Sequence, residues 1–307
     1  GKLIELNKET NENKISVGDV FLAKVGKTLT GLNAAFVNVG YQKDGFLHYH
    51  DLGVQLLSLS KFIKGVNTGK QKDFTLKNFH FEKDILKDGK IGDVLKTGQN
   101  TLVQIVKEPI STKGPRLNSE LSIAGRFLVL VPFSNRISVS QKIEDPKEKE
   151  RLKRLIKSIK PKNFGVIIRT VAIDKKVAEL DRDLQNSLER WVAMCKQIRR
   201  ADAPTKVLSE LNRASSILRD VFNDSFSNII VDDEALTVEI KDYIQEIAPS
   251  KESIVKFHKS NVPIFEKYGI ERQIKTAFGK TVSMSKGAYL VIEHTEALHV
   301  IDVNSGN

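Results

Sequence analysis

Near the N-terminal end of this chain, hydrophobic residues occur in short runs that are separated by turns. From Val17 to His48, short apolar runs alternate with glycine-bearing turns at residues 26–31 and 40–45. Short strands between such turns are typical of a small β-barrel. The apolar run at residues 101–107, which follows a glycine, predicts one further strand of this barrel.

The segment between these runs, residues 51–93, is longer than an ordinary connection between two strands. Because a structureless connection of this length is unusual, we expect part of it to fold, as one helix near residues 56–63. The segment interleaves lysines with phenylalanines, namely Lys61, Lys64, Lys70, Lys72 and Lys77 with Phe62, Phe74, Phe79 and Phe81. It either extends a surface for nucleic acid or is a solvated insertion.

A second group of strands is predicted after the barrel, at residues 121–132, 137–140 and 164–170. Between the last two, Asp145 and Pro146 are the residue types that open a helix, and Glu148 stands where a capping box places its acid. An apolar stripe runs from there to Ile159. The outer face of this helix is basic, which is usual for a solvated face and also fits an RNA-facing one.

The last part of the chain alternates helical and strand patterns. We expect a long helix from an N-cap at Asp174 to about Arg200. Helices and strands then follow in turn, at residues 207–222, 228–231, 234–247, 253–257 and 264–278, before closing hairpins. This alternation predicts an α/β layer. Near the other end, residues 2–6 resemble a short strand and residues 7–14 a polar linker.

The amino-acid composition indicates the size of the protein's cores and the kind of molecule that it could bind. A chain of 307 residues with 40% hydrophobic residues can bury about two to four domain cores. Forty-nine Lys and Arg against 38 Asp and Glu give a net charge of +11. This charge favours an anionic partner such as RNA, DNA or an anionic membrane, although a merely soluble basic protein would show it too.

The sequence has neither an 18-residue apolar run nor a signal peptide, so we expect a soluble, cytoplasmic protein that does not bind membranes. Cys195 is the single cysteine, and it stands at an apolar position of a helical pattern. It therefore forms no internal disulfide and is predicted to be a core residue. His48 and His50 lack accompanying cysteines or carboxylates, so they are interpreted as surface residues and not as a metal site.

Two places carry candidate chemistry. Asp302 interrupts an aliphatic strand pattern, where an ionised carboxylate is costly unless a metal or a basic partner offsets its desolvation. By residue type alone, a single acid in a strand is more often a bulge or turn residue than a ligand. Arg169 and Thr170 end another aliphatic run, where a guanidinium and a hydroxyl could hold a phosphate, or where Arg169 is simply an exposed charge.

Three motifs together resemble the ribonuclease E/G family of endoribonucleases: Leu-Asn-Ala-Ala-Phe-Val at 32–37 with Gly-Phe-Leu after it, Ile-Arg-Thr at 168–170, and Ile-Asp-Val-Asn-Ser-Gly at 301–306. The resemblance implies an α+β multidomain fold, in which an OB-fold β-barrel is inserted in an RNase H-like α/β subdomain and accompanied by a 5′-sensor subdomain and the start of a DNase I-like subdomain. The implied boundaries are an RNase H-like strand segment at 1–14, the barrel at 15–118 with its insertion at about 51–93, the 5′-sensor at 119–206, the RNase H-like subdomain at 207–278, and the DNase I-like start at 279–307.

The resemblance also implies roles for individual residues. Asp302 would be one of two carboxylates that hold a catalytic Mg²⁺, and Asn304 would help to position the scissile phosphate. Phe36 and Phe46 would stack RNA bases and Lys113 would contact a phosphate, although a strand phenylalanine is more commonly a core residue. The pocket for a 5′-monophosphate would consist of Arg169, Thr170, Gly125 and Val129. Gln141 and Lys142 replace the paired arginines of some relatives, so that auxiliary contact is not expected here.

The function implied is Mg²⁺-dependent hydrolysis of single-stranded RNA with a preference for 5′-monophosphate ends, in RNA processing and decay, including rRNA. The family's second metal-binding Asp and the cysteines that bridge its subunits through Zn²⁺ have no counterpart in these 307 residues. We therefore interpret the sequence as a fragment with little activity, and we expect Zn²⁺ and a homo-oligomer only for the full-length protein. The alternatives are a non-catalytic single-stranded RNA-binding protein and, third, a ribosome- or scaffold-associated interaction module.

Overall fold

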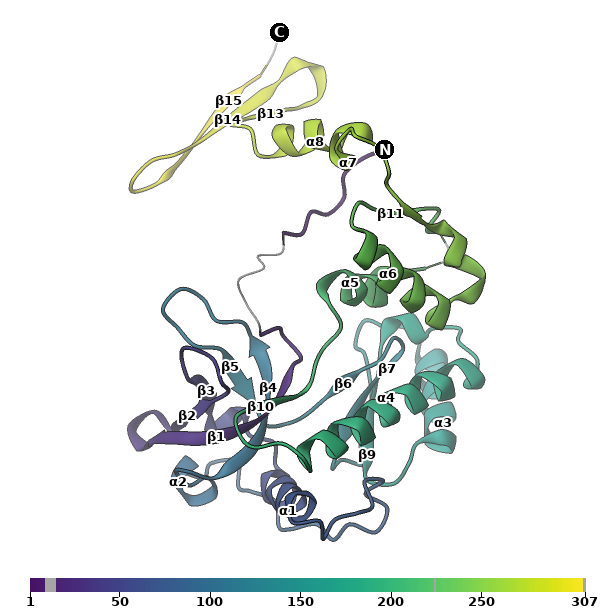
Figure 1. Cartoon of the computed structure of the whole chain (residues 1–307). Coiled ribbons are helices and arrows are strands. Elements are labelled where there is room, and N and C mark those ends of the chain that lie inside the picture. The colour runs from purple at the N-terminus through teal and green to yellow at the C-terminus, as the bar shows by residue number, and fades with distance from the viewer. Residues whose placement is uncertain (9–14, 224, 306–307) are drawn as a thin grey trace. The chain divides into compact units, whose positions relative to one another are not determined.

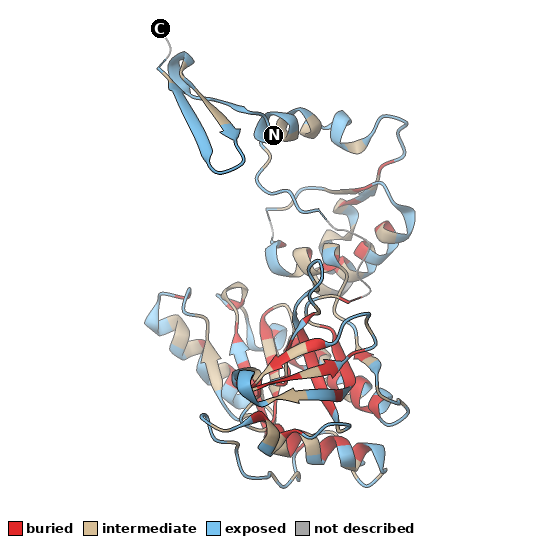
Figure 2. Cartoon of the chain, turned by 90° about the vertical axis from the view of Figure 1, so that its left-hand side faces the viewer, coloured by how far each residue is buried: buried red, intermediate tan, exposed pale blue. Residues whose placement is uncertain are grey.

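The computed structural model describes residues 1–8, 15–223 and 225–305. The chain divides into two compact units, one formed by Thr10–Val221 and the other by Gly1–Glu9 with Phe222–Asn307 (Figure 1). Buried residues gather in the sheets and helices of the Thr10–Val221 unit, whereas the hairpins near residue 300 are largely exposed (Figure 2). In the part of the chain that the structure describes, no helix is both long and apolar enough to span a membrane.

The first half of the Thr10–Val221 unit is a closed barrel of five strands, which is compatible with the predicted OB-fold. Its strands are β1 (Val20–Leu29), β2 (Ala34–Asn38), β3 (Gly45–His48), β5 (Arg116–Asn118) and β4 (Asn100–Lys107), in that spatial order. The barrel closes because β4 also pairs with the first half of β1. Alternate residues of β2 and β3 point inward, and their aliphatic side chains fill the barrel core.

The long segment between β3 and β4 contains the predicted helix, α1 (Leu56–Asn67), and a short second one, α2 (Ile91–Val94). Its phenylalanines do not form a solvated surface. Phe62 is fully buried and stacks on Trp191 with ring centroids 5.6 Å apart. Phe74 and Phe79 lie edge-on against Phe62, and Phe81 packs on Phe79. The segment is therefore part of the main core, and the hypothesis of a solvated insertion is wrong for its aromatic residues.

A second sheet follows in the order β6 (Ile123–Ala124), β7 (Leu128–Pro132), β9 (Phe164–Ile168) and β8 (Ile137–Val139). Two helices pack against it, α3 (Pro146–Ile159) and α4 (Val177–Ile198). Cys195 of α4 is buried as predicted, and burial raises the pKa of its thiol far above the ordinary value. After α4, β10 (Thr205–Leu208) pairs with the start of β1, and α5 (Arg213–Val221) completes the unit.

Of the two residues predicted to cap a helix N-terminus, one is confirmed and the other is wrong. Asp145 caps α3 as expected, because its carboxylate accepts the Lys147 N–H at 2.9 Å. Glu148 does not close a capping box; it binds the Arg151 guanidinium instead. The prediction of Asp174 as the cap of α4 is wrong: Asp174 has a positive φ of 61° and lies before the helix, which begins after Lys176.

In the other unit, β11 (Ile229–Val231) and β12 (Val255–Phe257) are parallel and are joined through α6 (Glu234–Ile247), as the α/β pattern predicted. The predicted helix at 264–278 is divided at Gly269 into α7 (Ile264–Lys267) and α8 (Ile270–Ala277). The antiparallel strands β13 (Thr281–Ser283), β14 (Tyr289–His294) and β15 (His299–Asn304) follow. The strand predicted at residues 2–6 is not formed: Ile4 is 94% exposed, and Leu3, which is half-buried, donates its N–H to the Gln273 side chain at 2.6 Å and not to a neighbouring strand.

Candidate RNA interface and active-site residues

One row of residues crosses the outer face of the barrel from strand to strand. The strand register pairs Lys27 with Phe36, Phe36 with Phe46, Phe46 with Arg116, and Arg116 with Lys107. Paired residues on neighbouring strands point to the same face. We call these five residues the aromatic–basic row: it has two aromatic rings at its centre and cations toward both ends.

Phe36 and Phe46 are half-buried, and neither belongs to the hydrophobic core of the barrel. Their rings lie edge-to-face with centroids 5.9 Å apart. Two further ring contacts follow along the chain. The ring centroids of Phe46 and His48 lie 6.4 Å apart, and those of His48 and His50 lie 5.1 Å apart. The two phenylalanines therefore do not fill the barrel core, and their RNA-stacking role stays a prediction.

Lys113 lies outside the aromatic–basic row. It is exposed and belongs to a tight turn in which residues 110 and 113 exchange backbone hydrogen bonds. The next residue, Gly114, is packed so closely that a Cβ there would lie 2.1 Å from the carbonyl oxygen of Asp44. This contact ties the Lys113 turn to the loop that leads into β3, so Lys113 stands near the edge of the same barrel face.

The residues predicted to sense a 5′-phosphate gather around the turn before β7. The Arg169 N–H donates to the Phe127 carbonyl at 2.9 Å, and its guanidinium donates to the Gly125 carbonyl at 3.0 Å. Val129 is half-buried on β7 opposite Ile167, and Thr170 starts the short 3-10 helix Thr170–Ala172 directly after Arg169. The structure thus brings Gly125 and Arg169 into contact and places the other two beside them along the chain.

A carboxylate that sequence reasoning missed organises this turn. Asp183 of α4 accepts the backbone N–H groups of Arg126, Phe127 and Leu128 at 2.8, 2.9 and 2.9 Å. Burial raises the pKa of Asp183 from its ordinary value, while these three donors and the charge of Arg169 oppose the rise. A Cβ at Gly125 would lie 2.6 Å from an Asp183 oxygen, so the close approach requires glycine.

Further charged groups surround the same turn. The Ala124 carbonyl accepts from Arg190 at 3.0 Å and from Arg219 at 3.4 Å, and Arg219 pairs with Glu210 at 2.7 Å. Asp220 pairs with Arg169 at 2.6 Å. No sequence signal indicated these contacts, because Arg190 lies on α4, Arg219 and Asp220 lie on α5, and Glu210 lies before α5, so that they meet only through tertiary packing.

In the other unit, Asp302 lies on β15 opposite Val291. Its aliphatic neighbours are 45%, 57% and 71% exposed at positions 300, 301 and 303, and Asp302 is exposed as well. The expectation of a desolvated acid is therefore wrong for the described residues, because the outer faces of this hairpin are uncovered. The Asn304 amide donates to an Asp302 carboxylate oxygen at 3.1 Å, so the two predicted active-site residues do contact each other.

Asp302 and Asn304 both offer side-chain oxygen atoms, which are the ligands that Mg²⁺ prefers. Within the described residues, no group of three His, Cys, Asp or Glu side chains is arranged to hold a metal ion. A metal at Asp302 would therefore have to complete its coordination with water, with phosphate oxygens of the RNA, or with a ligand outside the described residues.

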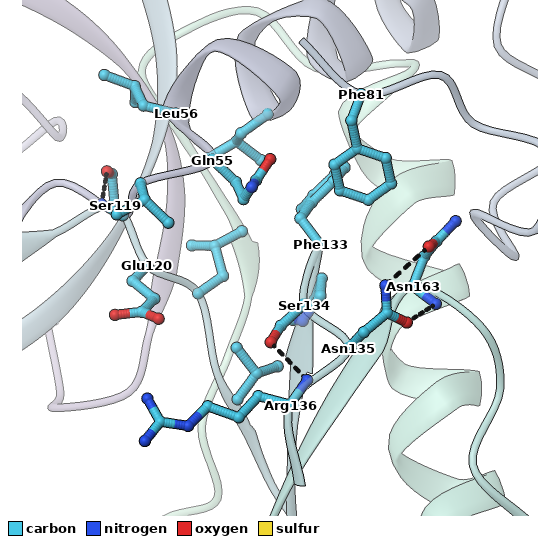
Figure 3. A pocket seen from close by; sticks show the side chains of 16 residues that line it. Gln55, Leu56, Phe81, Ser119, Glu120, Phe133, Ser134, Asn135, Arg136 and Asn163 are labelled. Atoms are coloured by element: carbon cyan, nitrogen blue, oxygen red, sulfur yellow. Dashed lines mark hydrogen bonds between the residues drawn. The ribbon is translucent and has the colours of Figure 1, made fainter. Parts of the chain in front are cut away.

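A cavity of about 370 Å³ lies where the 51–93 segment packs against β7 (Figure 3). Phe81 and Phe133 form one wall, and Gln55 and Glu120 lie across from them. Its polar end is ordered by Asn163, whose backbone N–H donates to the Asn135 side chain at 2.8 Å. No residue of the aromatic–basic row lines this cavity, so it belongs to the packing of the long segment.

Comparison with known proteins agrees with the motifs. A model of the "Ribonuclease E/G family" matches residues 122–307. Ribonuclease G of Haemophilus influenzae is 31% identical over 306 residues, which cover 100% of this chain and 58% of that protein. Ribonuclease G of Escherichia coli K12 is 30% identical over 306 residues, 100% of this chain and 59% of that protein. Ribonuclease E of Nostoc is 31% identical over 295 residues, 95% of this chain and 39% of that protein.

Proposed function

Because the chain belongs to the ribonuclease E/G family, we propose that it forms part of an endoribonuclease that hydrolyses single-stranded RNA with Mg²⁺ and prefers a 5′-monophosphate end. The chain spans less than two thirds of the ribonuclease G relatives, so this activity is proposed for the whole protein. The observation that carries the proposal is the contact between Asp302, which is exposed, and Asn304, which is half-buried: two side chains with oxygen atoms that touch on one strand.

The aromatic–basic row would bind the RNA strand. Bases would stack on Phe36 and Phe46, which is worth about 1 to 3 kcal/mol per base, while Lys27, Arg116 and Lys107 would neutralise phosphates. Stacking is indifferent to base identity, so the row would select single strands without reading a sequence. Lys113 at the edge of the face would contact a further phosphate.

The 5′ end would bind at Arg169 and Thr170. A guanidinium can donate two parallel hydrogen bonds to a phosphate, and a hydroxyl can add a third. The Thr170 hydroxyl makes no hydrogen bond to any residue that the structure describes, so it is available. Gly125 and Val129 would shape the pocket, and Asp183 would hold the turn that contains Gly125 in place.

At the scissile phosphate, Asp302 would hold the metal and Asn304 would orient the phosphate through its amide. A bound Mg²⁺ would neutralise charge on the phosphate and lower the pKa of the attacking water. The phosphorus–O3′ bond would break, with the water oxygen retained on the 5′-phosphate product and a proton delivered to the 3′-hydroxyl product. Asp302 needs no change of ionisation in this role, because it serves as an anionic ligand throughout.

The decisive experiment compares Asp302→Asn with Glu296→Gln in the full-length protein. Glu296 is an exposed acid in the turn between β14 and β15, so both variants remove one negative charge from the same hairpin. We expect Asp302→Asn to abolish cleavage of a single-stranded RNA and to preserve binding, while Glu296→Gln keeps both. Unchanged cleavage by Asp302→Asn would overturn the catalytic role of Asp302. RNA binding without any cleavage by the unchanged full-length protein would favour the second candidate, a non-catalytic RNA-binding protein that uses the aromatic–basic row alone.

The 5′-end preference has its own test. Arg169→Ala should remove the preference for a 5′-monophosphate over a 5′-hydroxyl without removing cleavage of the 5′-hydroxyl RNA.

For a polypeptide of these 307 residues alone, we propose weak Mg²⁺ binding and little hydrolysis, because its described residues supply one carboxylate at the site. Robust Mg²⁺-dependent cleavage by that polypeptide would overturn this part of the proposal.

We further propose that the full-length protein acts in the cytoplasm as a homo-oligomer, in the processing and decay of RNA that includes rRNA. Gel filtration of the full-length protein would test the oligomer, and the length of rRNA precursors in cells that lack it would test the process.

A further inference from the structure

The guanidinium that would read the 5′-phosphate is already engaged within the protein. One terminal nitrogen of Arg169 lies 2.6 Å from an Asp220 carboxylate oxygen, and the other donates to the Gly125 carbonyl at 3.0 Å. Both nitrogens that could grip a phosphate side by side therefore have a partner. A guanidinium has five N–H donors, so a phosphate could still reach the others, but it would then lie beside the Asp220 carboxylate, whose negative charge opposes it. Unopposed bidentate binding therefore requires that Asp220 moves away.

Of the acids near this turn, Asp220 is the one that can be displaced. Asp183 accepts three successive backbone N–H groups, which fix its position and leave those donors unavailable to a ligand. The Asp220 side chain is 46% exposed and stands at the end of α5, where it can turn into solvent. It also has an alternative partner, because Nε of Arg219 lies 3.3 Å from the same oxygen.

Arg219 would keep its own position without Asp220. Its guanidinium is held by Glu210 at 2.7 Å and by the Ala124 carbonyl at 3.4 Å, and its side chain is only 11% exposed. The loss of the Arg169–Asp220 contact would therefore leave the rest of the charged cluster assembled. The displaced carboxylate could stay paired with Arg219 while Arg169 turned to a ligand.

We propose that Asp220 lowers the affinity of this site for 5′-monophosphate ends, because its carboxylate occupies the Arg169 guanidinium until a 5′-phosphate displaces it. This proposal rests on the proposed 5′-end function. A phosphate monoester carries about −1.5 to −2 charges at neutral pH and offers three acceptor oxygens, against one charge on a carboxylate. It can therefore outcompete Asp220, whereas a 5′-hydroxyl cannot. The competition lowers affinity for phosphorylated ends and leaves affinity for 5′-hydroxyl ends, which place no phosphate on Arg169, unchanged.

The test measures binding of two RNAs of one sequence, with a 5′-monophosphate or a 5′-hydroxyl, by fluorescence anisotropy at fixed salt without divalent metal. Asp220→Asn should bind the monophosphorylated RNA about three- to tenfold more tightly than the unchanged protein does. Its affinity for the 5′-hydroxyl RNA should stay within about twofold. Asp220→Glu should behave like the unchanged protein, because the competing charge is kept.

Asp202→Asn is the matched control. Asp202 is exposed, and its carboxylate makes no ion pair with the described residues, so the variant changes net charge by the same amount. An equal gain for both RNAs in Asp220→Asn, or the same gain in Asp202→Asn, would overturn the proposal in favour of a general charge effect. Asp220→Ser provides a second way to remove the carboxylate, and it should raise the preference as well if Asp220→Asn folds poorly.

Arg169→Ala separates this inference from the function on which it rests. If the unchanged protein prefers the monophosphate and Arg169→Ala loses that preference while Asp220→Asn leaves it unaltered, the competitor role of Asp220 is wrong and the 5′-end function stands. If Arg169→Ala leaves the preference unaltered, the 5′-end function fails and the role of Asp220 fails with it.

Discussion

Phe36 and Phe46 show what a strand pattern can and cannot say about a single residue. Their motif predicted an RNA-stacking role, but the sequence left open whether the rings fill the core. The register decides this, because both rings share a face with Lys27 and Arg116, while the intervening aliphatic residues face the barrel interior. The shared face could not be predicted, since two bulge-like register shifts, at Val25/Lys27 and Ile105/Lys107, change which residues point outward.

We predict that Phe46→Ala weakens binding of an unphosphorylated single-stranded RNA by about 1 to 3 kcal/mol, because one stacking surface is lost. Fluorescence titration with the labelled RNA measures this change. Phe278→Ala is the control, since Phe278 is 78% exposed and lies outside the barrel. Equal loss in both variants, or none in Phe46→Ala, would contradict the stacking role.

Glu148 gives a pH-dependent prediction. Its carboxylate accepts two bonds from Arg151, at 2.6 and 2.7 Å, and one from the Asp174 N–H at 3.0 Å. The hydrogen bond from Arg151 holds the pKa of Glu148 below its ordinary value of 4.5, and burial opposes that shift. Because the folded pKa is the lower one, this stabilisation is complete above the ordinary pKa and is lost as pH falls through the folded pKa.

Glu148→Gln should therefore lower the free energy of unfolding by about 1 to 3 kcal/mol at pH 7, and the difference should shrink as pH falls below about 4.5. Urea unfolding at several pH values measures it. Glu150→Gln on the exposed side of the same helix should have little effect at any pH. A difference that stays constant down to pH 3 would show that the Glu148 charge is not what stabilises α3.

Among the elements, the 51–93 segment differs most from what its composition suggested. The helix α1 was predictable, since its apolar residues recur at helical spacing, but lysines between phenylalanines gave no sign of which side would be buried. The rings pack because Phe133 and Trp191, distant in sequence, provide a complementary surface for them. Local pattern cannot reveal such a partner.

We predict that Phe62→Ala lowers the free energy of unfolding by about 3 to 5 kcal/mol, because it leaves a cavity among four aromatic rings. Trp191 is the single tryptophan and contacts Phe62, so its fluorescence reports on this cluster during urea unfolding. Leu86→Ala in the same segment should cost less than about 0.5 kcal/mol, since Leu86 is 74% exposed. Similar values for the two variants would mean that the segment is not part of the core.

The proposed 5′-end site was predictable only in its outline. Arg169 and Thr170 could be singled out as a cation and a hydroxyl at the end of an aliphatic run, and the motif supplied their role. Asp183 and Asp220 could not be singled out, because neither belongs to a motif: Asp183 is one of several acids of α4, and Asp220 is a single acid near the end of α5. Their contacts depend on how α4 and α5 pack against the turn at residues 125–128.

At the scale of the whole molecule, the net charge of +11 predicts an anionic partner, and the structure shows three of the cations aligned with aromatic rings on one barrel face. The alternation of strands and helices predicted an α/β layer, and the family resemblance implied the mixed α+β class that the structure shows; the RNase H-like and DNase I-like identities stay predictions. The motif near Asp302 located the candidate catalytic residues but not their exposure, which depends on what covers the hairpin.

We predict that RNA affinity falls with salt and that Lys27→Ala reduces the slope of log K against log salt concentration by about 0.7, the value for one single-strand phosphate contact. Binding isotherms at several salt concentrations measure the slope. Lys267→Ala, which removes an exposed lysine of the other unit, should leave it unchanged. A slope that both variants reduce equally would mean that the protein senses only total charge.

The length of the aromatic–basic row sets a minimum length for an RNA strand that can contact all of it. The row crosses five strands, and four inter-strand steps of about 4.8 Å give a path of roughly 19 Å along the curved outer surface of the barrel. A dinucleotide cannot reach from Lys27 to Lys107, whereas an oligonucleotide of about four residues can, at the short end of what such barrels bind. The smallest degradation products would consequently dissociate unaided, while a long transcript stayed attached between successive cuts.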